Sequence, residues 1–289
     1  MRNGVDLHTH STASDGTYTP RDLIRKAQEV GLFAVALTDH DTIAGLAEAE
    51  EEAQARGVHF VPGVEISVKF EGPGHCHLLG YLFDYQHPGL VKTLQTLHEA
   101  RASRNQKMII KLQELGVDIT EEELKALAGE GEIGRPHMAK LLVQKGIVKD
   151  FDEAFERFLG KGRPAYVPKA LLSPREAIEI IHQAGGLTSL AHPYYLGFPE
   201  EEVRLFVKNL RDYGLDAIEA YYTDHDPSYT RFCLELAQEF DLLVTGGSDF
   251  HGDNKPEISL GTGKGDLFVP RKVYEDLLKA WEARRNKGQ

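Results

Sequence analysis

The sequence VDLHTHS, residues 5–11, reads as a β-strand and is followed by the loop ASDGTY. Its two histidines, His8 and His10, are two residues apart, so both rings point to the same side of the strand, as two ligands of one metal ion require. The loop places Asp15 shortly after the strand. We therefore expect a strand that ends in candidate metal ligands.

Helices and strands alternate along most of the chain. The first helix is expected to have Thr19 as its N-cap, Pro20 at its first position and Gly31 at its end. Six further segments read as strands: LFAVALT (32–38), VHFVPGVEISV (58–68), residues 75–83, LTSLAHP (187–193), DAIEAYYT (216–223) and LLVTGGSDF (242–250). The count predicts an α/β fold, a seven-stranded βα barrel.

The connection between the third and fourth strands is only EGPG, residues 71–74. Because a parallel crossover needs about a dozen residues, these two strands are predicted to be antiparallel. The beginning of the fourth strand, with His77, then lies at the rim where the parallel strands end. By strand alternation His75 shares the face of His77 and is a reserve ligand. Pro62 and Gly63 predict a break or bend in the third strand.

About 90 residues separate the fourth and fifth strands, far more than a crossover helix needs. They carry helical patterns and no long strand. We interpret residues 1–87 and 173–289 as the barrel domain. Residues 88–172 are predicted to form an inserted helical lid, a subdomain that selects the substrate.

Composition excludes several classes of protein. The net charge of −12 in 289 residues disfavours a scaffold for duplex DNA, although bound metal ions reverse the local charge of a pocket and permit an anionic substrate. No apolar run is long enough for a membrane span and no signal peptide is evident, so a cytoplasmic protein is expected. Two cysteines, Cys76 and Cys233, are too few for a disulfide framework.

Histidines and carboxylates gather at the predicted strand ends. A lone histidine there is more often a surface or hydrogen-bonded residue than a ligand, but so many at one barrel rim predict a metal site. Imidazole and carboxylate without thiolate suit Mn²⁺, Fe²⁺ or Zn²⁺. The candidates are His8, His10, Asp15, His40, Glu65, His77, His192, Asp249 and His251. Asp39 and Asp41 either orient His40 or cap the next helix, which is expected from about Thr42 to Arg56.

The motifs HTHSTASDGTYTP, LTDHDT, PGVEIS, HCHLLGY, LAHP and GGSDFHG resemble, in order and spacing, those of the PHP (polymerase and histidinol phosphatase) metal-dependent phosphoesterases. The resemblance implies a distorted seven-stranded barrel and three divalent metal ions, Mn²⁺ first among them. It implies the following ligand sets: His8, His10, Glu65 and Asp249 for the first ion; Glu65 as a bridge to a second ion held by His77 and His192; and Asp15, His40 and His251 for the third.

Within this family the chain resembles the branch with an inserted helical domain, similar to nucleoside 3′,5′-bisphosphate phosphatases, some of which trim RNA 5′ ends. We therefore predict hydrolysis of a phosphate monoester by a metal-activated hydroxide. The expected substrate is the 3′-phosphate of a nucleoside 3′,5′-bisphosphate such as adenosine 3′,5′-bisphosphate. Alternatives are a 5′-3′ exoribonuclease acting on short RNA ends, a histidinol-phosphate phosphatase and a non-catalytic metal-binding interaction domain.

Four residues are candidate substrate contacts. Arg135, in the sequence GRPH, combines a guanidinium with a helix N-terminus and suits a second phosphate. Arg104, with Arg101 one helical turn before it, either adds to this site or lies on a solvated helix face. Tyr222 and His225 either contact a nucleobase or phosphate or pack at the barrel mouth. The expected partner is a small phosphorylated nucleotide or a short RNA end, with neither duplex DNA nor a membrane involved.

Overall fold

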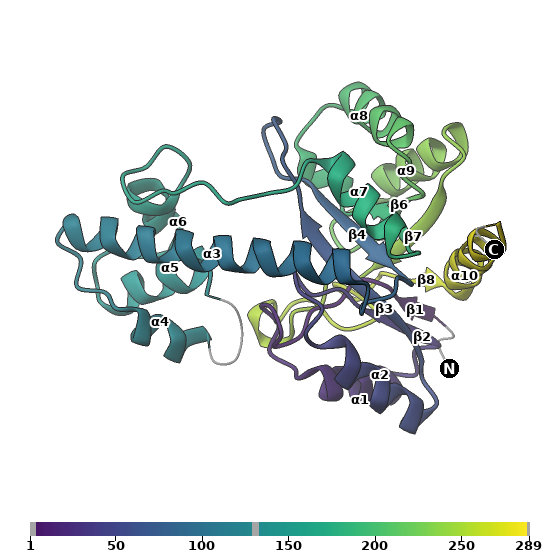
Figure 1. The fold of residues 1–289 in the computed structure, drawn as a ribbon, viewed down its shortest axis with the longest axis horizontal. Helices are drawn as coiled ribbons and strands as arrows, with labels where there is room; N and C mark the ends of the chain where they lie inside the picture. The colour runs from purple at the N-terminus through teal and green to yellow at the C-terminus, as the bar shows by residue number, and fades with distance from the viewer. Residues whose placement is uncertain (1–3, 129–132, 288–289) are drawn as a thin grey trace. The chain divides into compact units, whose positions relative to one another are not determined.

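The computed structural model describes residues 4–128 and 133–287 of the chain (Figure 1). It divides into two compact units. The barrel unit comprises Met1–Thr93 and Leu171–Gln289, and the helical unit comprises Leu94–Ala170. The two units are described separately below.

The barrel unit is built on one eight-stranded sheet in the order β7-β6-β5-β4-β3-β2-β1-β8. Its strands are β1 (Gly4–Asp6), β2 (Ala34–Leu37), β3 (His59–Ser67), β4 (His77–Tyr81), β5 (Leu187–Leu190), β6 (Ala217–Tyr222), β7 (Leu243–Gly247) and β8 (Val269–Pro270). The first seven correspond to the predicted segments. The eighth was not predicted, because two residues paired antiparallel with β1 are too few to show a periodic pattern.

The two ends of the sheet meet, so the sheet is nearly closed into a barrel. Beyond β1, the backbone N–H of Leu7 donates to Gly246 O at 3.0 Å, and that of Asp249 donates to His8 O at 2.8 Å. These bonds join the segment that follows β1 to β7 and its extension. The predicted barrel is therefore confirmed. The segment that continues β1 lies beside β7 and closes it.

The short turn after β3 has the predicted consequence. β4 pairs antiparallel with β3, with His77 opposite Ser67, and antiparallel with β5 on its other side. Pro62 and Gly63 do not interrupt β3, contrary to the predicted break. They mark the point where its pairing changes, because β3 pairs with β2 up to Pro62 and with β4 from Gly63 onward.

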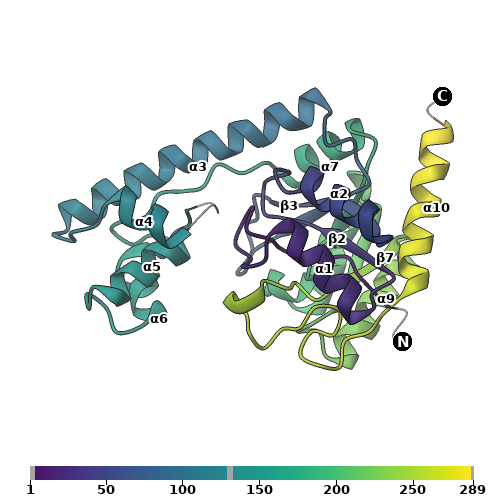
Figure 2. The same ribbon diagram turned by 90° about the horizontal axis from the view of Figure 1, so that it is seen from below.

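The helices of the barrel unit follow the predicted patterns. In α1, Thr19 Oγ1 accepts the N–H of Asp22, Pro20 is the first residue, and Gly31 adopts a left-handed conformation at the end. In α10, Val273 and Leu277 are buried against the barrel core, and Figure 2 shows this helix along the outside of the sheet. The helices are α1 (Pro20–Val30), α2 (Leu46–Arg56), α7 (Pro174–Gln183), α8 (Glu200–Asp212), α9 (Pro227–Glu239) and α10 (Arg271–Lys287), with single 3₁₀ turns η2 (Pro193–Leu196) and η3 (Gly252–Asn254).

The helical unit has its own hydrophobic core. Met108, Leu112, Leu124, Met138 and Leu142 are fully buried together in it. Its elements are α3 (Pro88–Glu114), which begins in the barrel unit, α4 (Glu121–Ala128), α5 (Arg135–Gln144), α6 (Phe151–Ala154) and the π-helical turn η1 (Phe155–Leu159). Within the described ranges, no helix has the length and apolar character needed to cross a membrane.

Candidate metal centre

The nine predicted ligands lie together at one rim of the barrel. Each belongs to at least one cluster of side chains whose nitrogen or oxygen atoms are all within 4.8 Å of one another. The clusters are His8, His10, Glu65 and Asp249; His10, Asp15, His40 and His251; His75, His77 and His192; and His40, Glu65 and His77. The antiparallel β4 brings His77 to this rim, as the turn length predicted.

The first cluster is fully formed from the ends of β1, β3 and β7. Nε2 of His8 lies 3.3 Å from Glu65 Oε2 and 3.5 Å from Asp249 Oδ1. Nε2 of His10 lies 3.3 Å from the same Glu65 oxygen and 3.1 Å from the same Asp249 oxygen. Two imidazole nitrogens and two carboxylate oxygens thus converge, in the geometry that the HxH spacing predicted.

Glu65 lies between this cluster and the next. Its Oε2 faces His8 and His10, while its Oε1 is 2.7 Å from His77 Nδ1 and 2.9 Å from His192 Nε2. The carboxylate is 1% exposed. One carboxylate with its two oxygens turned toward two sets of imidazoles has the geometry of a bridging ligand.

Asp15 joins the third set. Its Oδ1 is 3.2 Å from His251 Nε2, and its Oδ2 is 3.8 Å from His40 Nε2. His75, the reserve ligand, lies beside His77 and His192 with ring centroids 5.0 and 5.5 Å away. His75 is therefore available to the cluster of His77 and His192.

The donor atoms fit divalent metal ions. Among the described residues, buried polar atoms that lack a hydrogen-bond partner concentrate in these clusters: His8 Nε2, His10 Nδ1 and Nε2, His40 Nδ1, Glu65 Oε2 and His192 Nδ1. Buried polar atoms are almost always paired in folded proteins, so such a group calls for an additional partner. Imidazole nitrogens with carboxylate oxygens are suitable ligands for Mn²⁺, Fe²⁺ or Zn²⁺.

The electrostatics of the centre favour ionised carboxylates. Burial opposes ionisation of Glu65, but the surrounding histidines hold the pKa of its carboxyl well below the usual value. Burial lowers the pKa of His77 to about 4. For His10 the effect of burial is outweighed by the neighbouring carboxylates of Asp249 and Glu65, which raise its pKa to about 9. At neutral pH the metal-free centre therefore holds a proton on His10, whereas His77 is neutral.

Comparison with known proteins identifies the fold and its chemistry. Residues 6–162, more than half of the chain, match the PHP domain. The chain belongs to the PHP domain family. It is 39% identical over 251 residues to a 5′-3′ exoribonuclease of Haemophilus influenzae, a match that covers 87% of this chain and 91% of that protein.

Two further relatives cover nearly the whole PHP chain. A 3′,5′-nucleoside bisphosphate phosphatase of Chromobacterium violaceum is 33% identical, covering 94% of this chain and 96% of the other. A solved structure from Bifidobacterium adolescentis, described as a metal-dependent phosphoesterase, superposes with a TM-score of 0.81 at 32% identity and covers 96% of both chains. This PHP protein is thus a metal-dependent phosphoesterase, a hydrolase, and the non-catalytic alternative is set aside.

Residues around the ligand clusters hold the candidate ligands in place. Asp39 accepts hydrogen bonds from Ser11 N at 2.8 Å and from Ser14 Oγ at 2.5 Å, which fixes the loop that carries Asp15. Asp41 accepts from Ser67 N at 3.0 Å and ties the end of β2 to β3. Neither caps the following helix, which begins at Leu46, later than the expected Thr42, after an N-cap residue without a side chain.

Two residues near Asp249 restrain that carboxylate. Tyr222 OH donates to Asp249 Oδ2 at 2.8 Å, and Lys255 Nζ lies 2.7 Å from the same oxygen. Oδ1 is thereby left facing His8 and His10. Tyr222 is 3% exposed, so its ring packs at the barrel mouth. Sequence reasoning missed Lys255, whose position after the GGSDFHG motif was the available signal.

Sequence reasoning also missed Glu219, a fully buried carboxylate on β6. It contacts His8 Nδ1 at 3.0 Å and accepts the backbone N–H of His192 at 2.7 Å. A glutamate inside the apolar segment DAIEAYYT was the signal, because a charged residue in a buried strand needs a specific partner.

The other substrate candidates divide between the two units. In the barrel unit, His225 Nδ1 is 2.9 Å from Ala220 O, and its buried Nε2 has no partner within the described chain. In the helical unit, Arg104 is 7% exposed and donates from Nε to Val167 O at 3.1 Å. Arg135 begins α5, with its guanidinium 5.8 Å from the Tyr166 ring centre.

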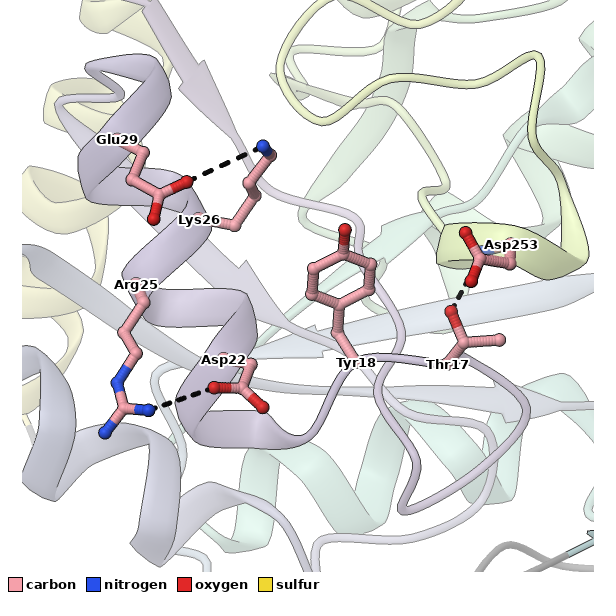
Figure 3. Close-up of a pocket in the computed structure, with 7 residues that line it drawn as sticks. All are labelled: Thr17, Tyr18, Asp22, Arg25, Lys26, Glu29 and Asp253. Carbon is pink, nitrogen blue, oxygen red and sulfur yellow. Dashed lines mark hydrogen bonds and ion pairs between the residues drawn. The ribbon is translucent and has the colours of Figure 1, made fainter.

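A separate surface depression of about 410 Å³ lies beside α1 (Figure 3). Its charged residues pair with each other: Arg25 with Asp22 at 3.1 Å and Lys26 with Glu29 at 3.6 Å. Its lining includes none of the nine candidate ligands. These pairs satisfy the local charges, so we interpret the depression as ordinary polar surface.

Proposed function

We propose that this PHP phosphoesterase removes the 3′-phosphate of a nucleoside 3′,5′-bisphosphate, such as adenosine 3′,5′-bisphosphate, and leaves the 5′-monophosphate. Such a substrate carries two phosphates and needs two anion sites. The observation that carries the proposal is the set of clustered candidate metal ligands in the barrel unit, in a chain that is 33% identical to a 3′,5′-nucleoside bisphosphate phosphatase. Arginines of the helical unit are candidates for binding the second phosphate.

This group consists of Arg101, Arg104 and Arg135. Burial, followed by the charges of Arg135 and Arg101, lowers the pKa of Arg104 to about 10. The positive charges of Arg101 and Arg135 therefore each repel that of Arg104. A phosphate would relieve this repulsion, since guanidinium and phosphate form charge-assisted, often bidentate hydrogen bonds. Arg135 adds the N-terminus of α5, a favourable position for an anion.

The metal centre is the proposed site of hydrolysis. Bound divalent ions would activate water near neutral pH and neutralise the charge of the phosphate. We propose that the nine clustered ligands, with Glu65 as the bridge, hold these ions, three in number and Mn²⁺ first. Lys255 restrains Asp249 and adds positive charge beside the centre. His225, through its unpartnered Nε2, is a further candidate contact for the nucleoside.

The decisive experiment compares substrates and identifies products. Mn²⁺-loaded protein is expected to cleave adenosine 3′,5′-bisphosphate far better than adenosine 3′-monophosphate or adenosine 5′-monophosphate. Chromatography of the products is expected to show adenosine 5′-monophosphate. Arg135→Ala should lower kcat/KM for the bisphosphate by about 2–4 kcal/mol, roughly 30-fold to 700-fold, because it removes a charge-assisted bidentate contact.

A control variant separates this effect from general loss of charge. Arg157→Ala removes a half-exposed arginine of the same unit that pairs with Glu153 at 2.6 Å, and it should leave the preference intact. Equal rates on mono- and bisphosphates, unchanged by Arg135→Ala, would refute the selective bisphosphatase.

A 5′-3′ exoribonuclease is the second candidate, favoured by the 39% identity to the Haemophilus influenzae exoribonuclease. Release of a 5′-mononucleotide from an RNA 5′ end breaks a phosphate ester at O3′, as removal of a 3′-phosphate does. The two activities therefore need the same metal centre. They differ in whether the attacked phosphate is a monoester or is also esterified to the next nucleotide. Stepwise release of mononucleotides from a 5′-phosphorylated oligoribonucleotide, at rates comparable to the bisphosphate, would favour this candidate.

A further inference from the structure

We infer that Glu219 is a positioning residue that couples the cluster of His8 and Asp249 to the cluster of His77 and His192. With one carboxylate it fixes the tautomer of His8 and the backbone of His192. The inference rests on the ligand clusters proposed above and does not depend on the identity of the substrate.

The geometry places Glu219 between two ligands from distant parts of the sequence. It lies on β6 (Ala217–Tyr222) and is fully buried. Its Oε1 is 3.0 Å from His8 Nδ1, and its Oε2 accepts the backbone N–H of His192 at 2.7 Å. His8 belongs to the cluster with Asp249, and His192 belongs to the cluster with His77. One side chain therefore restrains a member of each cluster.

The contact with His8 determines which ring nitrogen is available as a ligand. Glu219 Oε1 lies at hydrogen-bond distance from Nδ1 of His8, and a carboxylate oxygen in this position accepts the N–H of that ring nitrogen. The lone pair is then assigned to Nε2, the atom that lies 3.3 Å from Glu65 and 3.5 Å from Asp249. A carboxylate that orients a ligand histidine in this way also increases the basicity of the ring.

The contact with His192 stabilises an unfavourable backbone. His192 has φ 27° and ψ 63°, in the left-handed region that residues with a Cβ seldom adopt. Such conformations cost free energy and persist only where surrounding bonds impose them. The N–H of this residue is the one that donates to Glu219, and the resulting conformation brings Nε2 of its ring 2.9 Å from Glu65 Oε1.

Glu219→Gln tests the inference because an amide cannot reproduce both contacts. Its single oxygen can accept from His192 N–H, and its NH₂ group then faces His8 Nδ1 as a donor. His8 would be forced to place its proton on Nε2 and to lose its ligand lone pair. We expect Mn²⁺ affinity to fall 10-fold to 100-fold, the usual effect of removing such an orienting partner.

Two measurements provide the readout, without substrate. Calorimetric titration of metal-free protein with Mn²⁺ measures affinity, and ¹⁵N NMR of labelled histidines in protein loaded with diamagnetic Zn²⁺ reports which nitrogen of His8 carries the proton. Glu52→Gln is the matched control, because Glu52 is 6% exposed and pairs with Arg25 and Arg56 on the outside of the barrel. It should change neither Mn²⁺ affinity nor the His8 signal.

Glu219→Asp supplies a second variant if the glutamine variant folds poorly. It keeps the acceptor charge and should retain the Nδ1-protonated form of His8, with an affinity between those of the parent and Glu219→Gln. An unchanged His8 tautomer and parental Mn²⁺ affinity in Glu219→Gln would overturn the inference. Equal losses in Glu219→Gln and Glu52→Gln would also overturn it, because they would indicate a general structural effect.

Discussion

Replacement of Arg104 by Met tests whether the helical unit maintains a buried charge for a ligand. A pKa of about 10, against the ordinary 12.5, corresponds to roughly 3 kcal/mol of unfavourable free energy for the charged form. Solvent screening reduces this to about 1–2 kcal/mol. Met removes that cost and keeps much of the side-chain volume, but it also removes the bonds to Val167 O and Asn105 Oδ1. Each of these contributes about 1 kcal/mol.

The two effects nearly cancel. We therefore expect the free energy of unfolding of the ligand-free variant to stay within about 1 kcal/mol of the parent, although the substitution removes a buried side chain with two hydrogen bonds. In contrast, adenosine 3′,5′-bisphosphate should stabilise the parent and not the variant, because a ligand raises the melting temperature only of a protein that binds it.

Differential scanning calorimetry of metal-free protein, in which the nucleotide is not hydrolysed, measures both quantities. Arg157→Met serves as the control and should keep the nucleotide-induced increase in Tm. A loss of more than about 2 kcal/mol in ligand-free Arg104→Met, together with an unchanged response to nucleotide, would refute the reasoning and make Arg104 a structural residue.

Three further predictions concern the metal centre. Elemental analysis of carefully reconstituted protein should find more than one equivalent of transition metal per chain, since nine ligands exceed the coordination of one ion; one equivalent or less would contradict the multinuclear centre. Glu65→Gln should reduce turnover strongly while circular dichroism shows a retained fold, because the bridging position is lost and the barrel core is not altered; near-parental turnover would exclude the bridge. The raised pKa of His10, about 9 in the folded metal-free protein against 6.5 when unfolded, stabilises the fold by about 3 kcal/mol below pH 6.5, and this contribution should disappear as the pH rises through 9. Denaturant unfolding of metal-free protein across that range checks the sign, and calorimetry in buffers of different ionisation enthalpy should show proton release when Mn²⁺ binds.

The sequence was sufficient for the parts of the centre that depend on strand geometry. The HxH spacing placed His8 and His10 on one face, and the four-residue turn implied the antiparallel β4 that brings His77 to the rim. Both conclusions follow from the period of a strand and the minimum length of a crossover.

Other features depend on contacts between distant segments and could not be predicted. Glu219 reaches His8 across 211 positions of sequence, and no local pattern specifies that pairing. Tyr222 was expected either at the substrate or in the barrel mouth, and its bond to Asp249 decides its position only once β6 and β7 are paired. The burial of Arg104 likewise follows from packing of the helical unit, since the sequence is equally consistent with a solvated helix face.

Anomalous diffraction from crystals of the active, Mn²⁺-loaded protein tests the central claim most directly. More than one manganese peak is expected among the clustered side chains, with one about 2 Å from the Nε2 atoms of His8 and His10 and with the Glu65 carboxylate between two peaks. A single peak, or manganese bound away from these residues in protein that still hydrolyses phosphate esters, would contradict the account.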